Sequence, residues 1–282
     1  MLSNTVAITG ATGYVGGVIA GHLGANSYKV VTLTRSTDET MNGLENRYFD
    51  LNEEPESDLL RGIDVLIHAA WNLGSNSDAQ SWDQNVVSAR KLFECAQKNG
   101  VTKVIFISSM SAYEGTRQSY GLMKLSVEQT ALDLGYAVVR PGLVYGPGAK
   151  GMAGTLTKIS KLPLWPSFRR SHLFLVHQDD LATALQQIIV GYDDFCAEVT
   201  GLANENAVSL SALLSQLSST GASRPTLRIP SSVVMKSLRA FERLGVKFPF
   251  RSDSLLGIVE PPKRVPGFER CQRNGIRFRP LS

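Results

Sequence analysis

Several features that mark specialised classes of protein are scarce in this sequence. Of its 282 residues only three are cysteines, and Cys95, Cys196 and Cys271 are scattered without CxxC spacing. This pattern argues against a disulfide framework or a zinc site and suits a reducing compartment, so we expect a cytoplasmic protein. The four histidines are equally dispersed, and we expect no metal site.

Long apolar runs and long basic runs are also missing. No apolar run approaches the roughly 18–20 residues that span a bilayer. A signal peptide is not expected, because Thr5–Thr9 already has the pattern of a first core strand. The net charge is only +4, and basic residues do not alternate with aromatic ones. We therefore expect neither a membrane nor a nucleic acid as partner, and the small excess charge is either solvated or faces phosphates of a small ligand.

The sequence does contain short β-branched runs that alternate with longer amphipathic stretches, which is typical of βαβ units and a parallel sheet. The strand runs are apolar on both sides, as expected where helices cover both faces of a sheet. We predict strands at Thr5–Thr9, Lys29–Thr34, Arg47–Phe49, Asp64–His68, Lys103–Ser108, Tyr136–Arg140, His172–Val176 and Glu198–Gly201. We predict helices near 14–24, 79–99, 119–134, 178–190, 209–219 and 231–244, and a further helix start at 252–256.

This pattern predicts the α/β class, with a doubly wound parallel sheet and a small C-terminal lobe. The alternation loosens after Arg140, where segments 142–154 and 162–171 are rich in glycine or proline and are interpreted as loops. We assign residues 1–201 to the main domain and residues 202–282 to a substrate-binding lobe, to which 142–172 contribute.

A glycine-rich loop follows the first strand and opens the first helix, with the sequence Gly10-Ala-Thr-Gly13-Tyr-Val-Gly16. Gly10 permits a tight turn, Gly13 lets the backbone approach a pyrophosphate, and Gly16 allows close packing of the helix on the sheet. The free N–H groups of the helix start then face the negative charge. The loop predicts an NAD(P)-binding Rossmann fold, with cofactor contacts from Gly10, Thr12, Gly13, Tyr14, Val15 and Gly16.

The end of the second strand bears on the choice between NAD(H) and NADP(H). An acidic residue there would bind the adenosine ribose, but Arg35 follows the strand instead. A guanidinium favours the 2′-phosphate, so we expect NADP(H) with NAD(H) as the alternative. The alternative is that Arg35 is an ordinary surface residue that points into water. Asp50 and Leu51 follow the third predicted strand, and Asp50 either accepts a hydrogen bond from the adenine amino group or forms a turn.

Only one of the eight tyrosines, Tyr120, has a lysine four residues later, at Lys124. On a helix this spacing puts both side chains on one face. A phenol has a pKa of about 10, which is high for acid–base catalysis near neutrality, and a nearby ammonium lowers that pKa. The helix follows the strand Lys103–Ser108, at whose carboxyl end ligands bind. A serine there, between Ser108 and Ser111, either donates a hydrogen bond to a substrate carbonyl or makes a turn.

Together these residues resemble the extended short-chain dehydrogenase/reductase family, in particular its NAD-dependent epimerase/dehydratase branch. The resemblance covers about residues 5–205 and is carried by seven motifs in the family's order. They are Thr9–Gly16, Asp64–Ala70, Asn85-Val86, Ile107-Ser-Ser-Met-Ser-Ala-Tyr113, Tyr120-Gly-Leu-Met-Lys-Leu-Ser-Val-Glu128, Arg140-Pro-Gly-Leu-Val-Tyr-Gly-Pro147 and Val176-His-Gln-Asp-Asp-Leu-Ala182.

The resemblance implies a role for each matching residue. The catalytic set comprises Tyr120 as general acid/base, Lys124 as the ligand of the nicotinamide ribose that tunes Tyr120, Ser109 as the group that polarises the substrate, and Asn85 as a support of the site. The cofactor groove is lined by Ala69 and Ala70 on the adenosine side, by Pro141 and Val144 beside the nicotinamide, and by Ser108. A homodimer through the helices at 79–99 and 119–134 is also implied.

Two departures from the family's pattern limit the reaction and the substrate. Members that dehydrate nucleotide sugars carry an Asp-Glu pair where this sequence has Met110 and Ser111, so a dehydratase is disfavoured. Many nucleotide-sugar epimerases carry an arginine that clamps the diphosphate, where this sequence has Leu173. Arg169 and Arg170 lie close by in the sequence, which leaves a nucleotide-sugar substrate open.

The sequence favours an NADP(H)-dependent oxidoreductase that reduces a carbonyl of a sugar-like substrate, nucleotide sugars included, with Tyr120 as general acid/base. The second hypothesis is a nucleotide-sugar epimerase that recycles its NAD internally. The third is a non-catalytic NADP(H)-binding regulator or assembly factor on the same fold. Such proteins typically lose the tyrosine or the lysine of the pair, and this chain keeps both.

Overall fold

A mostly parallel sheet forms the centre of the protein, whose computed structural model describes residues 4–41, 43–74, 78–169, 171–218, 223–243 and 252–281. The strand order is β12-β7-β6-β5-β1-β2-β4-β3. Among the described strands of this sheet, only β3 (Thr40–Met41) pairs antiparallel, with β4. The parallel strands are β1 (Thr5–Thr9), β2 (Lys29–Thr34), β4 (Leu44–Tyr48), β5 (Val65–His68), β6 (Lys103–Ile107), β7 (Ala137–Pro141) and β12 (Val199–Leu202). This order confirms the predicted doubly wound sheet.

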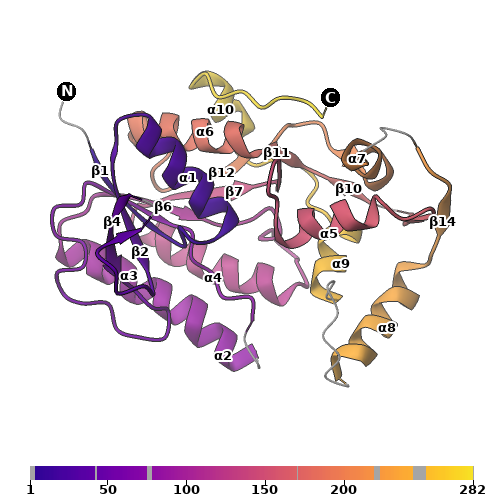
Figure 1. Cartoon of the computed structure of the whole chain (residues 1–282), viewed down its shortest axis with the longest axis horizontal. Coiled ribbons are helices and arrows are strands. Elements are labelled where there is room, and N and C mark those ends of the chain that lie inside the picture. Colours follow the sequence, from indigo (N-terminus) through magenta and orange to yellow (C-terminus); the bar gives the residue numbers. More distant parts are fainter. Residues whose placement is uncertain are drawn as a thin grey trace.

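Helices cover both faces of the sheet (Figure 1). One face packs against α1 (Tyr14–Ala25) and α6 (Gln178–Val190), and the other against α3 (Ser88–Lys98) and α4 (Ser119–Asp133). Successive residues of a strand point to opposite faces, so Ile8 and Ala7 lie in different cores. Both faces are buried under helices, which explains why the strand runs are apolar throughout.

The predicted elements are largely present, with shifted bounds in several places. The helix predicted at 79–99 is a continuous run of α2 (Asp78–Trp82), the π-helix η1 (Asp83–Val87) and α3. The strand predicted at His172–Val176 is two short strands, β10 (His172–Leu173) and β11 (Leu175–His177). Two further short elements are η2 (Tyr192–Asp194) and β13 (Val208–Ser209), and β13 pairs with β10.

The interpretation of 142–154 as a loop is wrong in part. This segment forms β8 (Leu143–Tyr145) and the start of α5 (Gly151–Ile159). β8 pairs with β11, which follows α5, β9 (Trp165–Ser167) and β10 in the chain. Because this pairing joins distant segments, it leaves no local sequence pattern. Similarly, β9 pairs with the distant β14 (Thr226–Arg228).

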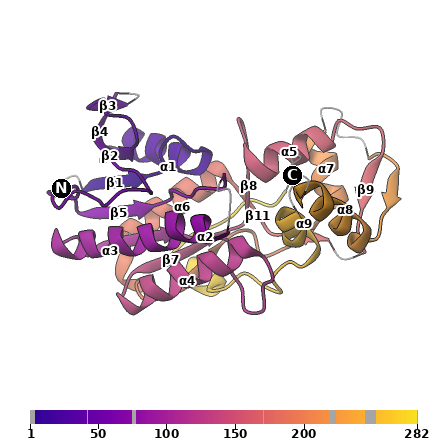
Figure 2. The ribbon, with the colours of Figure 1, turned by 90° about the horizontal axis from the view of Figure 1, so that it is seen from below.

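A second group of elements lies to one side of the sheet (Figure 2). It contains α5, α7 (Leu210–Leu217), α8 (Ser231–Arg243) and α9 (Ser252–Val259), around a core that includes Leu156, Trp165 and Leu213. Residues 219 and 244, where the predicted helices end, lie outside the described residues. The predicted boundary at residue 201 stays a prediction, but α10 (Phe268–Arg273) returns to the sheet, because Cys271 packs in the core with α1 and α6.

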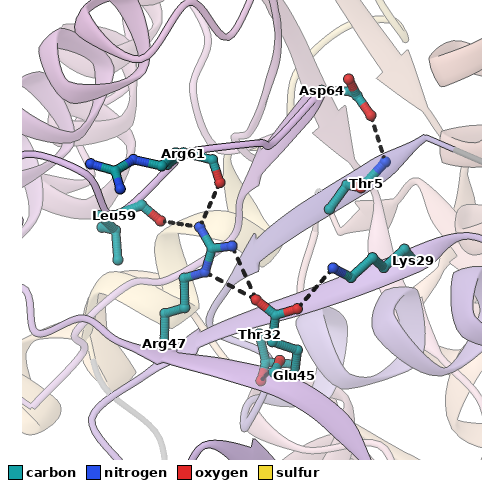
Figure 3. Close-up of polar contacts among 8 residues, drawn as sticks. All are labelled: Thr5, Lys29, Thr32, Glu45, Arg47, Leu59, Arg61 and Asp64. Carbon is teal, nitrogen blue, oxygen red and sulfur yellow. Dashed lines mark hydrogen bonds and ion pairs between the residues drawn. The ribbon is translucent and has the colours of Figure 1, made fainter.

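Polar contacts hold β4, the strand between β2 and β3, in place (Figure 3). The carboxylate of Glu45 binds Lys29 of β2 at 3.1 Å and Arg47 at 3.0 Å. The guanidinium of Arg47 also donates to the carbonyls of Leu59 and Arg61, at 2.8 and 3.0 Å. These contacts fix β4 against β2 and against the loop before β5, and so they set where the carboxyl end of β4 lies.

Three observations bear on the expected class of protein. Within the described ranges, no helix is long and apolar enough to cross a membrane. No group of three or more histidine, cysteine, aspartate or glutamate side chains in that same part of the chain has the arrangement of a metal site. Cys95, Cys196 and Cys271 are free thiols.

Candidate functional site

The carboxyl ends of the parallel strands open onto a cleft of about 710 Å³. It lies at the point where the chain connections diverge from β1 and β5, which is where doubly wound sheets bind ligands. Its walls include Ser109 after β6, Val144 after β7 and Tyr120 in α4. Leu256 of α9 closes it from the other side, so both groups of elements contribute to the site.

The glycine loop after β1 is shaped for close approach of a diphosphate. Gly10 has a φ of +72°, and a Cβ there would lie 2.8 Å from the Cα of Ala70. A Cβ on Gly16 would lie 2.3 Å from the carbonyl oxygen of Gly10. Gly13, the N-cap of α1, has no side chain to satisfy the first amides of the helix. The loop therefore leaves a cradle that a side chain would fill, and it fits the diphosphate of a nicotinamide dinucleotide.

The other loop residues predicted to contact the cofactor surround this cradle. Thr12 and Gly13 are exposed, and Tyr14 and Val15 line the cleft together with Pro141 and Val144.

A buried hydroxyl fixes Ala69 and Ala70 beside Gly10. The Oγ1 of Thr9 accepts hydrogen bonds from the amides of Ala69 and Ala70, both at 3.0 Å, and lies 2.8 Å from Nδ1 of His68. Because this oxygen already accepts two bonds, its own hydrogen points to Nδ1, which assigns the proton of the imidazole to Nε2. Burial, together with the charge of Lys124, lowers the pKa of His68 to about 3, so this ring is neutral.

Arg35 and Asp50 follow two paired strands, β2 and β4, and lie near Tyr48. A hydrogen bond to Glu53 raises the pKa of Tyr48, and the charges of Asp50 and Arg35 also act on this phenol, in opposite directions. Arg35 is exposed. One carboxylate oxygen of Asp50 accepts from the amide and the side chain of Asn52, at 2.8 and 2.7 Å, which is the turn that the sequence allowed. Leu51 packs against the core of α3.

The structure brings the hydroxyl groups of Tyr120 and Ser109 together, as predicted. Tyr120, in the first turn of α4, packs edge-on against Trp71 with 5.7 Å between the ring centroids. Burial raises the pKa of Tyr120 to about 12, while a hydrogen bond with the Ser109 hydroxyl acts in the opposite direction. The same Ser109 oxygen accepts the amide of Ser111 at 3.1 Å. A phenol and a hydroxyl thus converge on one point of the cleft.

Lys124 lies on the same helical face as Tyr120, as predicted, and is almost completely buried. Its Nζ donates to the carbonyl of Ile107 at 2.7 Å and lies 3.7 Å from the centroid of the Trp71 ring and 5.8 Å from that of Tyr120. Burial lowers the pKa of Lys124 well below its usual value. In this structure burial raises the pKa of Tyr120, and the expectation that Lys124 lowers it stays a prediction.

Asn85 and Ser108 have structural partners. Asn85 accepts from the amide of Asn72 at 2.7 Å and donates back to its carbonyl at 3.0 Å. It therefore positions the loop that carries Trp71. The hydroxyl of Ser108 donates to Glu128, whose carboxylate binds the guanidinium of Arg140 at 2.5 Å. Ser108 thus turns its side chain to a buried ion pair, whereas Ser109 and Ser111 line the cleft.

Many residues of the cleft were not predicted, among them Trp71, Gln118 and Asp253. Trp71 directly follows the alanine pair at the end of β5, and this position is the only signal that would have found it. The side-chain nitrogens of Trp71 and Gln118 are buried without a hydrogen-bond partner among the described residues. Leu173 also lines the cleft and is 6% exposed. Arg169 lines a separate pocket, and Arg170 lies outside the described residues.

Comparison with known proteins agrees with this arrangement. Residues 6–189 match the model of a family described as the NAD dependent epimerase/dehydratase family. Ceramide reductase of Caulobacter vibrioides is 28% identical over 194 residues, which are 64% of this chain and 59% of that protein. UDP-glucose 4-epimerase of Vibrio cholerae is 26% identical over 187 residues, 56% of this chain and 57% of that protein. The chain thus spans less than two thirds of the length of these curated relatives.

Solved structures show the same fold over the whole chain. The structure of gox2253 has a TM-score of 0.77 at 21% identity and covers 99% of this chain and 94% of its own. UDP-N-acetylglucosamine 4-epimerase from Bacillus cereus has a TM-score of 0.68 at 17% identity and covers 99% of both chains. At these identities the likeness concerns the fold alone.

Proposed function

The chain belongs to the NAD dependent epimerase/dehydratase family, and we propose that it is an NAD(P)-dependent oxidoreductase that acts on a carbonyl or secondary alcohol with Tyr120 as general acid/base. The observation that carries this proposal is the convergence of the Tyr120 phenol and the Ser109 hydroxyl in the cleft that the glycine loop opens. A phenol and a hydroxyl so placed bind one substrate oxygen from two sides.

When bound, a nicotinamide dinucleotide supplies the hydride that reduces the substrate carbon or accepts one from it. Ser109 donates a hydrogen bond to the substrate oxygen and orients it toward Tyr120. In reduction Tyr120 gives its proton to that oxygen, and in oxidation it takes the proton back. Because burial raises the pKa of Tyr120 to about 12, the phenol carries its proton at neutral pH, as a general acid in reduction requires.

The proposed cofactor contacts follow the carboxyl edge of the sheet. The loop residues Gly10 to Gly16 hold the diphosphate, and Ala69, Ala70, Asp50 and Leu51 surround the adenosine. Lys124 would bind the nicotinamide ribose, and Pro141 and Val144 would flank the ring. Asn85 would support this arrangement indirectly, because it accepts the main-chain amide of Asn72 in the loop that carries Trp71.

We further propose that the protein prefers NADP(H) and reduces a carbonyl of a sugar-like substrate in the cytoplasm. Arg35 supports the cofactor choice, since it is exposed at the carboxyl end of β2, where an acidic residue would repel a 2′-phosphate. The free thiols suit a reducing compartment. A homodimer through α3 and α4 stays a prediction.

A nucleotide-sugar epimerase with an internally recycled cofactor is a second candidate. It is favoured by the similarity to UDP-glucose 4-epimerase of Vibrio cholerae over more than half of both chains. Tyr120 would then act twice on one substrate oxygen, first as a base and then as an acid, while Ser109 stays hydrogen-bonded to that oxygen. No net oxidation of the cofactor accompanies that reaction.

The test is to mix the protein with NADPH and a panel of ketoses and nucleotide-4-ketosugars while following the absorbance of the reduced nicotinamide. Turnover that Tyr120→Phe abolishes and Tyr28→Phe retains supports the reductase, because Tyr28 lies before β2, away from the cleft. In a second mixture of NAD with nucleotide sugars, an epimerised product without net formation of NADH identifies the epimerase. Cofactor binding without turnover of any panel member indicates the non-catalytic binding protein.

A further inference from the structure

Gln118 places an unsatisfied amide in the cleft. It is the N-cap of α4, two residues before Tyr120, and its side chain is 3% exposed. The residue lines the cleft, and its Nε2 has no hydrogen-bond partner among the described residues. Buried donors in folded proteins are rarely left unpaired, because each costs free energy that pairing would recover. An acceptor supplied from outside the chain would satisfy this one.

Beside this buried amide the facing helix α9 has a glycine, Gly257, in place of a larger residue. A Cβ built on Gly257 of α9 would lie 3.5 Å from Oε1 and 3.7 Å from Nε2 of Gln118, and 3.7 Å from Cε of Met152. Leu256 lines the same wall and is 7% exposed. The missing side chain at position 257 therefore leaves room in front of the amide for an atom of a ligand.

Two charged side chains that also line the cleft, those of Asp253 and Arg117, already have partners in the chain. The carboxylate of Asp253 accepts the amides of Ser119 and Tyr120. The guanidinium of Arg117 pairs with Glu260. Since an unpaired charge is costly to bury among methionine and leucine side chains, the group that enters here is uncharged.

We propose that Gln118 and Gly257 form a substrate subsite in which the Gln118 amide donates to an uncharged oxygen on an otherwise apolar substituent. The inference rests on the proposed function, and it narrows the substrate to a ketone, or its alcohol, that carries a second acceptor oxygen, as in an oxo ester or a diketone. This oxygen orients the substrate so that its reacting carbonyl faces Tyr120 and Ser109.

The first test compares Gln118→Leu with the wild-type protein on two ketones of equal chain length. Ethyl acetoacetate has an ester beyond the ketone, and methyl pentyl ketone has methylenes there. The expected result is a loss of about tenfold in kcat/KM for ethyl acetoacetate, with methyl pentyl ketone unchanged. Gln129→Leu is the matched control, because Gln129 is exposed on the same helix and binds Asp133; it changes neither rate.

Thermal unfolding separates substrate binding from a structural role. Gln118→Leu removes an unpaired buried amide, so it melts at the same or a higher temperature than the wild type. Ethyl acetoacetate raises the melting temperature of the wild type and not that of the variant. A variant that melts lower, or that loses activity equally on both ketones, overturns the subsite.

Gly257→Ala probes the same space from the facing helix. Its methyl group lies at ordinary contact distance and alanine favours a helix, so α9 keeps its fold. The methyl fills the room before the amide, and KM for ethyl acetoacetate rises about tenfold. An unchanged KM overturns the proposal.

The two proposals fail in different ways. If the protein reduces ketoses or nucleotide ketosugars but neither of the two simple ketones, the subsite is wrong and the proposed function stands. If it reduces no carbonyl compound at all, the proposed function is wrong. In that case the melting-temperature shift with ethyl acetoacetate still decides the subsite, and no shift overturns it.

Discussion

The carboxylate of Asp253 accepts the main-chain amide of Tyr120 at 3.3 Å and that of Ser119 at 3.0 Å. These amides belong to the first turn of α4, where a helix lacks partners of its own. A residue of α9 therefore caps the helix that carries the proposed proton donor. Besides burial, the charge of Asp253 raises the pKa of Tyr120, so the position of α9 affects both the placement and the protonation of this phenol.

Replacing Asp253 by asparagine should lower the pKa of Tyr120. The amide still accepts one of the two hydrogen bonds, but the negative charge that disfavours the phenolate is gone. Burial, the larger cause, remains, so the pKa falls without reaching that of an exposed tyrosine. Alkaline titration of tyrosinate absorbance, with a Tyr120→Phe background for each protein, measures the change.

The same substitution weakens the cap of α4 by about 0.5–1 kcal/mol, measured by urea unfolding. Asp133→Asn is the matched control, since Asp133 lies exposed at the other end of α4 and binds Gln129. A titration midpoint of Tyr120 that Asp253→Asn leaves unchanged would contradict the electrostatic link.

Gly16→Ala should disrupt the diphosphate cradle. The new methyl would lie 2.3 Å from the carbonyl oxygen of Gly10, so α1 must move away from the loop. We expect a loss of stability of roughly 1–3 kcal/mol together with loss of NADPH binding, measured by thermal unfolding and by fluorescence.

Gly21 offers a control on the same helix, because nothing lies within 4 Å of a Cβ built there. Gly21→Ala should stabilise α1 by about 0.5–1 kcal/mol and leave NADPH binding intact. Equal effects of the two substitutions would mean that close packing at Gly16 is not what the loop requires.

The sheet and the glycine loop could be predicted because their causes are local. Strands with both faces buried are apolar throughout, and β1 and β2 have the predicted bounds. The spacing of Tyr120 and Lys124 placed them on one helical face, and the structure keeps them there. Each of these features depends on residues that are close in the sequence.

Contacts between distant segments could not be predicted. The choice between Ser108 and Ser109 depends on which one faces α4, where Glu128 takes the hydroxyl of Ser108. Successive side chains at a strand end point to opposite sides, so Ser109 reaches the cleft and Ser108 does not. Gln118 and Asp253 join the site because α9 docks on α4, and no periodicity in either segment encodes that docking.

Arg35→Ser should reduce the preference for NADP(H). The guanidinium would bind the 2′-phosphate at an exposed site, so its loss should raise the Kd of NADPH about tenfold or more and leave that of NADH nearly unchanged. Fluorescence titration of the reduced cofactors measures both constants. Arg61→Ser is the control. Arg61 lies before β5, at the amino ends of the parallel strands, and pairs with Asp58. Equal losses for NADPH and NADH would contradict a role in phosphate recognition.

His68 should make the fold sensitive to acid. Burial lowers the pKa of its imidazole to about 3, against about 6.5 in an unfolded chain, so the neutral ring favours the folded state above pH 6.5. That contribution is lost as the pH falls toward 3, at about 1.4 kcal/mol for each pH unit. His68→Asn keeps an acceptor for the Thr9 hydroxyl and cannot take up a proton in this range. The variant is less stable at neutral pH, because the stacking of His68 on Phe106 is lost, but its stability should fall less steeply between pH 6.5 and 4. Urea unfolding at a series of pH values gives both slopes, and parallel slopes would show that His68 is not the group that responds.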